Sequence, residues 1–322
     1  MLSKLNVVVL DGFTLNDIPW KGYDQFASFT LYDVTDPGQI VERCKDADVI
    51  LTNKVTIGEA EFMALHRLSY IGVLATGYDN ISLNAAKRHG VVVTNVPVYA
   101  NYSVAQLVFG LLMELCYHVA LHHKTIVVDK KWSGYHINSY WEMPLIELYG
   151  KTMGVIGMGK IGERVGIIAE AFGMKVIAQD AFERPIDTIR DFQWVSLDEL
   201  LARSDVVSIH CPLFPETRGM MNRDAFSKMK PNAFFINTSR GPLVVEEDLR
   251  WALDNGVIAG AGLDVLSSEP PAYDNPMFEA KNCVLTSHIG WATVEARGRL
   301  VEIALQNIIA KFAGNPANVV NG

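Results

Sequence analysis

The sequence predicts an α/β protein of two domains, in which a doubly wound nucleotide-binding domain is inserted into a smaller parallel-sheet domain. Short apolar runs rich in β-branched residues alternate with polar or amphipathic segments along most of the 322 residues, as in βαβ units. A glycine-rich turn, residues 157–162, lies between two such runs in the middle of the chain. An amphipathic helix is expected at about residues 294–313, and the central block becomes an insertion if this helix packs on the N-terminal residues.

The first block, residues 1–97, indicates a parallel sheet with intervening helices. We expect its strands at residues 6–10, 29–34, 49–52, 70–75 and 91–95. The carboxyl ends of parallel strands face the ligand crevice, which draws attention to the loops at residues 52–54 and 75–80. Backbone N–H groups of the second loop are suited to a small anion such as a carboxylate. The alternative, that each loop is an ordinary polar turn, stays open from the residues alone.

The segment after Pro97 indicates a long helix, residues 103–121, followed by an arm. Apolar side chains lie on nearly every side of this helix, so we expect it to be buried all round, between domains or in a dimer interface. The arm, residues 122–150, is rich in Trp, Tyr, Ser and Asn and lacks a clean period. Its aromatic side chains, Trp132 and Trp141 among them, are expected to meet a second subunit, with core packing as the alternative.

The central stretch, residues 151–180, contains a short apolar strand, a G-x-G-x-x-G turn, an amphipathic helix, a second strand and an acid. Gly157 allows the tight turn, and Gly159 lets the backbone approach a pyrophosphate. Gly162 lets the helix pack close to the strand, and the free N–H groups of the helix N-terminus face the phosphates. A lone glycine motif is weak, but here its flanking elements fit a dinucleotide-binding fingerprint better than a purely structural turn.

The acid of this fingerprint is Asp180. A carboxylate at this position accepts hydrogen bonds from the adenosine ribose hydroxyls and repels the 2′-phosphate of NADP. Arg184 is a nearby cation, but we weigh it below Asp180. The sequence therefore predicts NAD as the cofactor.

The nucleotide-binding domain is expected to continue to about residue 289. Strands at residues 153–156 and 175–178 are followed by strands at residues 206–210, 234–237, 258–263 and 284–287. Helices are expected at residues 197–202, 223–228 and 246–255, with Asp224 and Glu246 as acids of their cap regions. Six parallel strands in two halves form the doubly wound pattern. Two chain crossings, near residues 97–103 and 290–293, predict a hinge and a substrate cleft between the domains.

Arg240, Glu269 and His288 each follow an expected strand, at the edge of the sheet where a cofactor would lie. Hydride transfer to a 2-oxo acid needs a cation that holds the carboxylate and polarises the carbonyl, which Arg does bidentately. It also needs a proton donor, naturally His, and a carboxylate that orients the imidazole and favours its protonated form. Each residue alone has an ordinary structural alternative, and it is the set of three that indicates catalysis. No G-x-S-x-G motif supports a hydrolase.

Composition excludes several other classes. The formal net charge of −8, without a Lys/Arg cluster, argues against a nucleic-acid partner. The cysteines are far apart: Cys44, Cys116, Cys211 and Cys283. This spacing predicts neither disulfides nor a zinc site, and His118 and His122 lack a third ligand, so we expect no metal. The sequence contains no stretch of 18 apolar residues free of charge, so it predicts no membrane span. The first apolar run is expected to be a strand rather than a signal peptide, and we therefore expect a cytoplasmic protein.

Over essentially its whole length, the chain resembles the D-isomer-specific 2-hydroxyacid dehydrogenase family. The resemblance lies in the central nucleotide stretch, in NTSRGPLVVEEDL with Arg240, in GLDVLSSEPP with Glu269, and in LTSHIGWAT with His288. It implies a Rossmann-type doubly wound NAD domain, residues 101–292, inserted in a flavodoxin-like substrate domain, residues 1–100 and 293–322. It also implies a helical dimerisation arm at about residues 103–148. Arg240 would bind the substrate, with Glu269 as the carboxylate partner of the acid/base His288.

The resemblance further implies which residues contact the ligands. NAD contacts are expected at Thr76, Gly157, Gly159, Lys160, Ile161, Gly162, Asp180, Cys211, Pro212, Thr238, Ser239, Arg240, Asp264, His288 and Gly290. Substrate contacts are expected at Lys54, Ala75, Thr76, Gly77, Trp141, Arg240 and His288. By the same resemblance, Asp264 lies near the nicotinamide and Trp141 reaches the active site of a partner subunit.

Three stretches resemble one branch of the family, glycerate dehydrogenase (hydroxypyruvate reductase). They are LTNK with LATGYDN, YWEMPLIELYGKTMG, and SHIGWATVEAR. We therefore expect NADH-dependent reduction of hydroxypyruvate to D-glycerate by a homodimer. Two alternatives stay open. One is the same chemistry on another small 2-oxo acid, such as glyoxylate or pyruvate. The other is an NAD-sensing corepressor-type binding protein, which predicts slow turnover.

Overall fold

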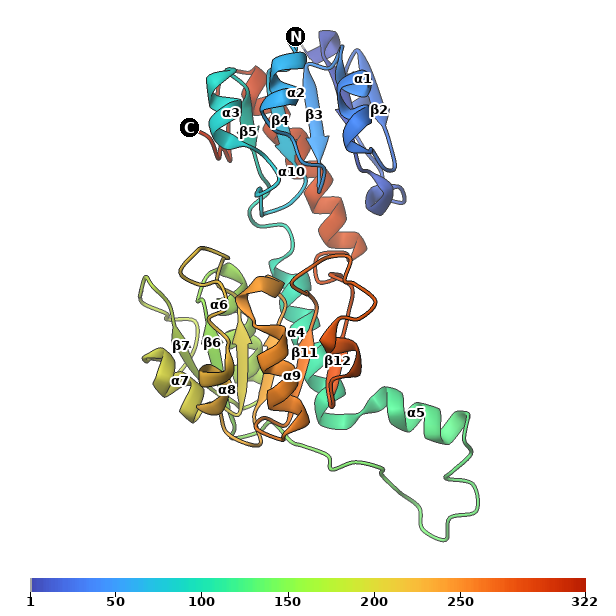
Figure 1. Ribbon diagram of the computed structural model, residues 1–322, viewed down its shortest axis with the longest axis vertical. Coiled ribbons are helices and arrows are strands. Elements are labelled where there is room, and N and C mark those ends of the chain that lie inside the picture. Colours follow the sequence, from blue (N-terminus) through green and yellow to red (C-terminus); the bar gives the residue numbers. More distant parts are fainter. Residues whose placement is uncertain (1) are drawn as a thin grey trace. The chain divides into compact units, whose positions relative to one another are not determined.

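The computed structural model describes residues 2–322, which divide into two compact units (Figure 1). Unit 1 comprises the residues up to Ala100 together with Trp291–Gly322, and unit 2 comprises Asn101–Gly290. Unit 2 is therefore one continuous segment that interrupts unit 1 in the sequence. Both units are α/β with parallel sheets, as the sequence predicts.

Unit 1 is built on a parallel sheet whose described strands run in the order β2-β1-β3-β4-β5. These strands are β1 (Asn6–Val9), β2 (Ser28–Leu31), β3 (Val49–Thr52), β4 (Tyr70–Val73) and β5 (Val92–Thr94). Val8 of the central β1 pairs with Thr30 on one side and with Ile50 on the other. The order reverses between β1 and β3, which is the flavodoxin-like order, so this part of the predicted fold is confirmed.

Helices cover the sheet of unit 1. They are α1 (Ile40–Cys44), α2 (Glu59–Ala64), α3 (Leu83–Arg88) and α10 (Val294–Phe312), with short 3-10 helices at Leu2–Lys4, Phe13–Leu15, Tyr23–Gln25 and Pro37–Gln39. Alternate side chains of the strands, such as Ile50 and Ile71, share a core with α1 to α3. The C-terminal helix α10 joins this unit through polar contacts: the Tyr23 hydroxyl donates to Val301 O at 3.1 Å, and Asn307 Nδ2 donates to Asn95 O at 3.0 Å.

Unit 2 contains a parallel sheet in the order β12-β11-β10-β9-β6-β7-β8, all within the described residues (Figure 1). Its strands are β6 (Thr152–Ile156), β7 (Lys175–Gln179), β8 (Gln193–Trp194), β9 (Val206–Ile209), β10 (Phe234–Asn237), β11 (Gly260–Leu263) and β12 (Cys283–Leu285). Counted from β6, the order is 3-2-1-4-5-6-7, the doubly wound order extended by one strand. The predicted number of six strands was wrong, because β8 has only two residues and no apolar run from which a strand could be predicted.

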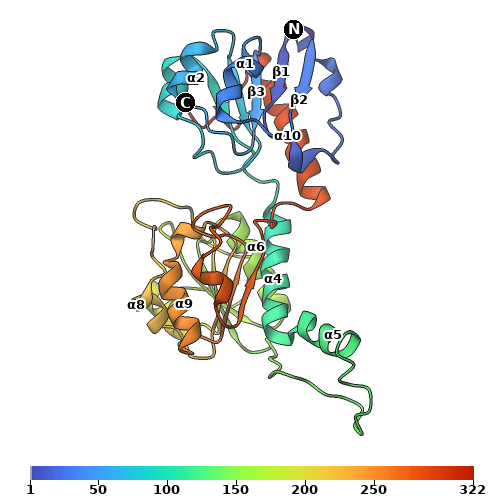
Figure 2. The ribbon, with the colours of Figure 1, turned by 45° about the vertical axis from the view of Figure 1, so that its right-hand side comes forward.

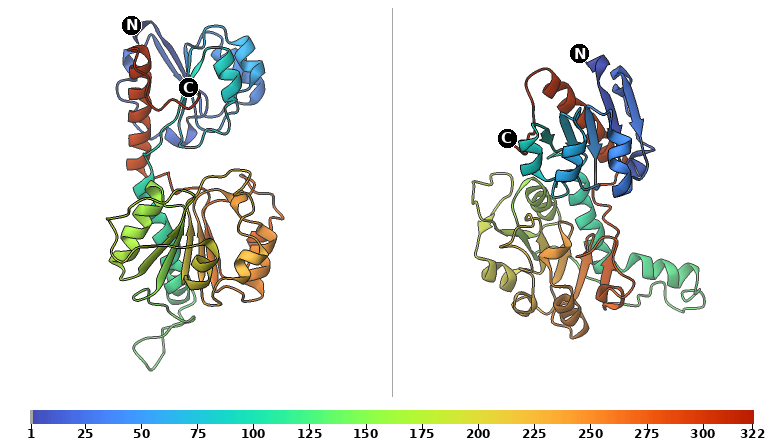
Figure 3. Two further views of the ribbon diagram at one scale, coloured as in Figure 1. Left: turned by 90° about the vertical axis from the view of Figure 1, so that its left-hand side faces the viewer. Right: turned by 45° about the horizontal axis from the view of Figure 1, so that its top comes forward.

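Helices cover both faces of this sheet (Figure 3). They are α4 (Asn101–Tyr117), α6 (Lys160–Ala171), α7 (Leu197–Arg203), α8 (Arg223–Ser227) and α9 (Glu246–Asp254), with 3-10 helices at Gly241–Leu243 and Pro276–Glu279. A further helix, α5 (Val119–Val127), follows α4. Phe234 and Ile236 of β10 pack with α4 and α6, whereas Phe235 packs with α7, α8 and α9. A strand buried on both faces explains the continuous apolar runs of the sequence.

The helix and arm after residue 100 differ from the prediction in two ways. The single helix expected at residues 103–121 is broken at His118, whose φ of 48° is left-handed, and α4 and α5 are bent by 54° there. The arm is helical only as far as Val127, whereas a helical arm to about residue 148 was expected. Its later part has no helical period and contains Gly134, with φ of 90°, and Pro144.

Helix α4 is not buried on all sides, as was expected. Tyr102, Gln106 and Gly110 form an exposed stripe along it, while the opposite side is fully buried. Helix α5 and the loop that follows extend away from the rest of unit 2 (Figure 2). This arm exposes many large apolar side chains: Val119, Val127, Val128, Trp132, Tyr135, Ile137, Trp141, Leu145 and Tyr149.

Within residues 2–322, no helix taken singly has the length and apolar character to cross a membrane. Helices α4 and α5 meet the length and composition requirement only when they are taken together across their bend.

Candidate active site

The glycine turn between β6 and α6 has three glycines with three different surroundings. Gly157 has φ of 91°, and a Cβ there would lie 2.5 Å from Cys211 N. A Cβ on Gly162 would lie 2.1 Å from Gly157 O. A Cβ on Gly159 would meet no described atom within 4 Å. The first and third glycines are thus required by the packing of the chain itself, whereas the second faces open space at the N-terminus of α6, where a phosphate is favoured.

Asp180 follows β7 and is fixed against this turn. Its Oδ2 accepts a hydrogen bond from Met158 N at 2.6 Å, and its Oδ1 accepts one from Phe182 N at 3.1 Å. A carboxylate has about four acceptor positions, so two remain for ribose hydroxyls. Lys160 and Ile161, also predicted to contact NAD, are the first two residues of α6.

The floor of this site contains buried polar atoms. Thr238 Oγ1, just after β10, is buried without a hydrogen-bond partner among the described residues. His210 lies at the end of β9, and its Nε2 is hydrogen-bonded to Ser208 Oγ at 2.8 Å. Burial lowers the pKa of His210 to about 3. Burial raises the pKa of the neighbouring Cys211 thiol to about 11, so both side chains are neutral at physiological pH. The unpaired hydroxyl of Thr238 and the open space beside Gly159, both judged within the described residues, fit a bound dinucleotide. His210 was missed, although its position at a strand end was a usable signal.

His288 and Glu269 form a close pair. His288 Nδ1 lies 2.6 Å from Glu269 Oε2, and their side chains are 24% and 35% exposed. Glu269 Oε1 also accepts from Leu266 N at 3.3 Å, which closes a small turn around the carboxylate. Because Nδ1 is engaged by the carboxylate, Nε2 is the ring nitrogen left for a substrate.

The backbone of His288 is held by Asp264. His288 has φ of 56°, a left-handed conformation that costs about 1–3 kcal/mol for such a residue. Asp264 is 1% exposed, and its carboxylate accepts from Ile289 N and Gly290 N, each at 2.8 Å. Its third bond, at 2.6 Å, comes from Thr286 Oγ1, and its backbone carbonyl accepts from His288 N at 2.7 Å. Asp264 thus fixes both sides of the His288 turn.

Arg240 reaches the same region from β10. Asn237 Nδ2 donates to Arg240 O at 2.9 Å, and Arg240 Nη1 donates to Ser239 O at 2.9 Å. A Cβ on the next residue, Gly241, would lie 1.9 Å from the carbonyl carbon of Leu266. The Arg240 segment and the turn that carries Glu269 therefore touch backbone to backbone. Since β10, β11 and β12 are neighbours in the sheet, the structure brings these two residues and His288 to one edge.

A cavity of about 700 Å³ adjoins the pair. Its lining includes Asp264, Glu269, Phe278, His288 and Ile289. Phe278 and Ile289 give it apolar walls beside the polar pair, as in sites for small organic ligands.

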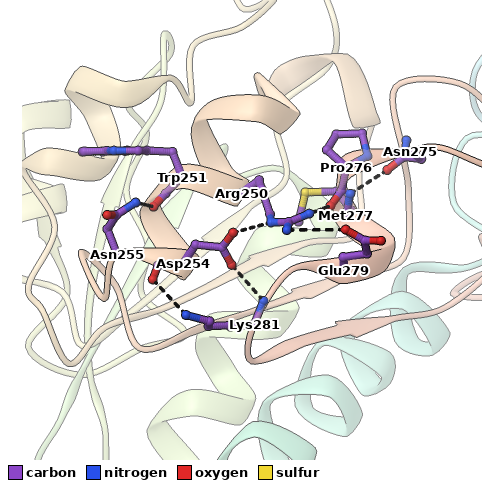
Figure 4. A network of polar contacts seen from close by, with 9 residues as sticks. All are labelled: Arg250, Trp251, Asp254, Asn255, Asn275, Pro276, Met277, Glu279 and Lys281. Atoms are coloured by element: carbon purple, nitrogen blue, oxygen red, sulfur yellow. Dashed lines mark hydrogen bonds and ion pairs between the residues drawn. The ribbon is translucent and has the colours of Figure 1, made fainter.

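Helix α9 braces the loop that carries Glu269. Glu246 is 8% exposed, and its carboxylate accepts from Ser267 N at 2.5 Å and from Asn275 Nδ2 at 2.9 Å. One turn further along α9, Arg250 Nη1 donates to Pro276 O at 2.7 Å and pairs with Asp254 (Figure 4). Glu246 was expected to act near the cap of α9. Its carboxylate instead holds the loop that carries Glu269, a contact over 21 residues that no local pattern predicts.

The other predicted substrate residues lie elsewhere in the chain. In unit 1, the backbone N–H of Lys54 donates to Asp11 Oδ2 at 2.5 Å. The loop of Ala75, Thr76 and Gly77 is pinned through its carbonyl groups, since Ala75 O accepts from Val96 N at 3.0 Å and Thr76 O accepts from Asn95 Nδ2 at 2.7 Å. Trp141 is on the arm of unit 2 and is 62% exposed. A substrate role for these residues stays a prediction.

Comparison with known proteins places this geometry in context. Residues 109–290 match the family described as D-isomer specific 2-hydroxyacid dehydrogenase, NAD binding domain. A hydroxypyruvate reductase of Blautia hydrogenotrophica is 46% identical over 322 residues, which cover 98% of this chain and 100% of the relative. A glycerate dehydrogenase of Methylorubrum extorquens is 38% identical, with 88% of each chain covered. An acyclic imino acid reductase solved with NADPH and D-Arg has a TM-score of 0.86 at 30% identity, covering 98% of this chain and 100% of the other.

The glycine turn generates a paired prediction. Gly162→Ala should lower the free energy of unfolding of unit 2 by about 1–3 kcal/mol, and with it the melting temperature, because the new methyl group overlaps Gly157 O. Gly159→Ala should leave the melting temperature unchanged yet weaken NADH binding by about tenfold or more, which corresponds to about 1.4 kcal/mol. Thermal melts and a fluorescence titration with NADH measure the two effects. Wild-type NADH affinity in the Gly159→Ala variant would place the pyrophosphate away from this turn.

Proposed function

The chain belongs to the D-isomer-specific 2-hydroxyacid dehydrogenase family, and we propose that it catalyses the NADH-dependent reduction of hydroxypyruvate to D-glycerate and the reverse oxidation. The observation that carries the proposal is the 2.6 Å contact between His288 Nδ1 and Glu269 Oε2 beside a cavity of the NAD-binding domain. The relatives named hydroxypyruvate reductase and glycerate dehydrogenase support this substrate.

In the proposed reaction, His288 moves the proton. Glu269 holds Nδ1, so Nε2 is the atom that gives its proton to the carbonyl oxygen of the 2-oxo acid during reduction. The contact with the Glu269 carboxylate also fixes the orientation of the imidazole ring. In the oxidation of D-glycerate, Nε2 takes the proton back from the C2 hydroxyl. The bound NADH supplies the hydride to C2.

Arg240 binds and polarises the substrate in this proposal. A guanidinium presents parallel N–H donors to a carboxylate and can also donate to the adjacent carbonyl oxygen. The segment of Arg240 is fixed by Asn237 on one side and by the close approach of Gly241 to Leu266 on the other. These contacts fix the backbone from which the guanidinium of Arg240 extends.

The cofactor is assigned to the glycine turn and its neighbours. The diphosphate would lie on residues 157–162, and the hydroxyls of the adenosine ribose would donate to Asp180. Thr238, whose hydroxyl is otherwise an orphan, would gain a partner from the dinucleotide.

We also propose that the chain forms a homodimer through its arm. Trp132, Ile137 and Trp141 are 44%, 60% and 62% exposed on the arm, and α4 carries an exposed stripe. Several large apolar side chains exposed on one segment support a protein interface there, since aromatic residues are enriched at such interfaces.

The substrate is tested with a panel of 2-oxo acids. We expect kcat/KM for NADH oxidation at about 340 nm to be highest with hydroxypyruvate, compared with glyoxylate, pyruvate and 2-oxoisocaproate. A bulky 2-oxo acid in first place would retain the mechanism and exclude glycerate as the product. Absence of turnover with every acid would favour the NAD-sensing binding protein instead.

The role of His288 is tested by substitution. His288→Ala should lower kcat by about 10²–10⁴-fold, the usual contribution of general acid catalysis. Glu269→Gln should also lower kcat, because an amide replaces the charged hydrogen-bond partner that holds His288 Nδ1. His66→Ala, at an exposed position of unit 1, is the matched control and should match the wild type. A near-normal kcat of His288→Ala would remove this residue from the mechanism.

The dimer is tested by sedimentation. We expect the wild type to sediment as a dimer at micromolar concentration and the triple variant Trp132→Ser, Ile137→Ser, Trp141→Ser to dissociate at concentrations where the wild type does not. Tyr273→Ser changes a fully exposed aromatic residue outside the arm and should sediment like the wild type. A monomeric wild type, or a triple variant that stays dimeric, contradicts the proposed interface.

A further inference from the structure

A cation lies beside the acid of the nucleotide site. Arg184 Nη2 is 3.4 Å from Met158 O, while Asp180 Oδ2 accepts from Met158 N at 2.6 Å. The arginine and the aspartate therefore hold the two polar groups of one residue in the glycine turn.

Taken alone, Arg184 would favour NADPH. A phosphate monoester carries about −1.5 to −2 charges at neutral pH, and a guanidinium is its natural bidentate partner. A cation next to the 2′-hydroxyl position would thus offset the repulsion from Asp180.

Glu163, in the first turn of α6, neutralises the charge with which Arg184 would attract a 2′-phosphate. Its Oε2 lies 2.5 Å from Arg184 Nη2, and its Oε1 accepts from Thr188 Oγ1 at 2.9 Å. The carboxylate of Glu163 is only 18% exposed, compared with 45% for the Arg184 side chain, so the acid is the better fixed partner. The hydrogen bond from Arg184 lowers the pKa of Glu163, which is therefore ionised at neutral pH.

We propose that Glu163 is a specificity-determining residue that excludes NADPH by neutralising Arg184, the cation hydrogen-bonded to the same residue of the glycine turn as Asp180. The inference rests on the proposed placement of the adenosine ribose at Asp180. It has a definite consequence: removal of the Asp180 charge alone does not release Arg184, so acceptance of a 2′-phosphate requires both acids to change.

The test measures binding of two adenosine fragments by titration calorimetry. The probes are 5′-ADP and 2′,5′-ADP, and the variants are Asp180→Ser, Glu163→Gln, the double variant, and the double variant with Arg184→Ala. We expect the added Glu163→Gln change to tighten 2′,5′-ADP binding by about tenfold or more over Asp180→Ser, while 5′-ADP changes by less than about twofold. Arg184→Ala should cancel the gain. Gln retains an oxygen that can accept from Thr188, so this contact survives.

Glu170→Gln is the matched control. Glu170 lies on the same helix, and its Oε1 accepts from Arg190 N at 2.7 Å in the same loop as Arg184. Added to Asp180→Ser, it should leave the affinity for 2′,5′-ADP within about twofold. The inference is overturned if Glu163→Gln gives no gain, if Glu170→Gln gives an equal gain, or if the gain persists without Arg184. If 5′-ADP binds none of the variants and not the wild type, the proposed cofactor site fails, and the inference fails with it.

Discussion

The buried carboxylate of Asp264 is the interaction on which the site depends. Three donors from the segment after β12 converge on it, and together they keep His288 in a left-handed backbone conformation. An unsupported residue would leave that conformation, because the strain of about 1–3 kcal/mol would be released. The 2.6 Å contact between His288 and Glu269 presupposes this turn. The geometry of the pair formed by His288 and Glu269 is thus set one strand away, by a residue that directly follows β11.

Much of the fold and of the site could be predicted from the sequence, because parallel sheets leave strong local signals. Strands buried on both faces give apolar runs, and ligand-binding residues follow such runs at the carboxyl ends. Arg240, Glu269 and His288 were predicted in this way, and the structure brings the segments that carry them together.

The features that were not predicted lack such signals. Strand β8 has two residues, and the break at His118 uses a left-handed residue that is neither Gly nor Pro. Glu246 has the sequence position of a capping acid. Only the folded chain shows that Ser267 N and Asn275 Nδ2 each donate to one of its two carboxylate oxygens. Contacts over long sequence separations depend on how the whole chain packs, so they cannot be predicted from a short stretch of sequence.

The brace from α9 divides the segment after β11 into parts of unequal freedom. Ser267 and Asn275 are tied to Glu246, whereas Ala272, Tyr273 and Asp274, between them, are exposed to solvent. One end of this apex is tied to a braced residue, because Ala272 O accepts from Asn275 N at 3.1 Å. Pro271, next to the apex, lines the same cavity as His288. A fluorescent dye attached at residue 273 would consequently report on occupancy of that cavity while the anchored ends of the loop stay as they are.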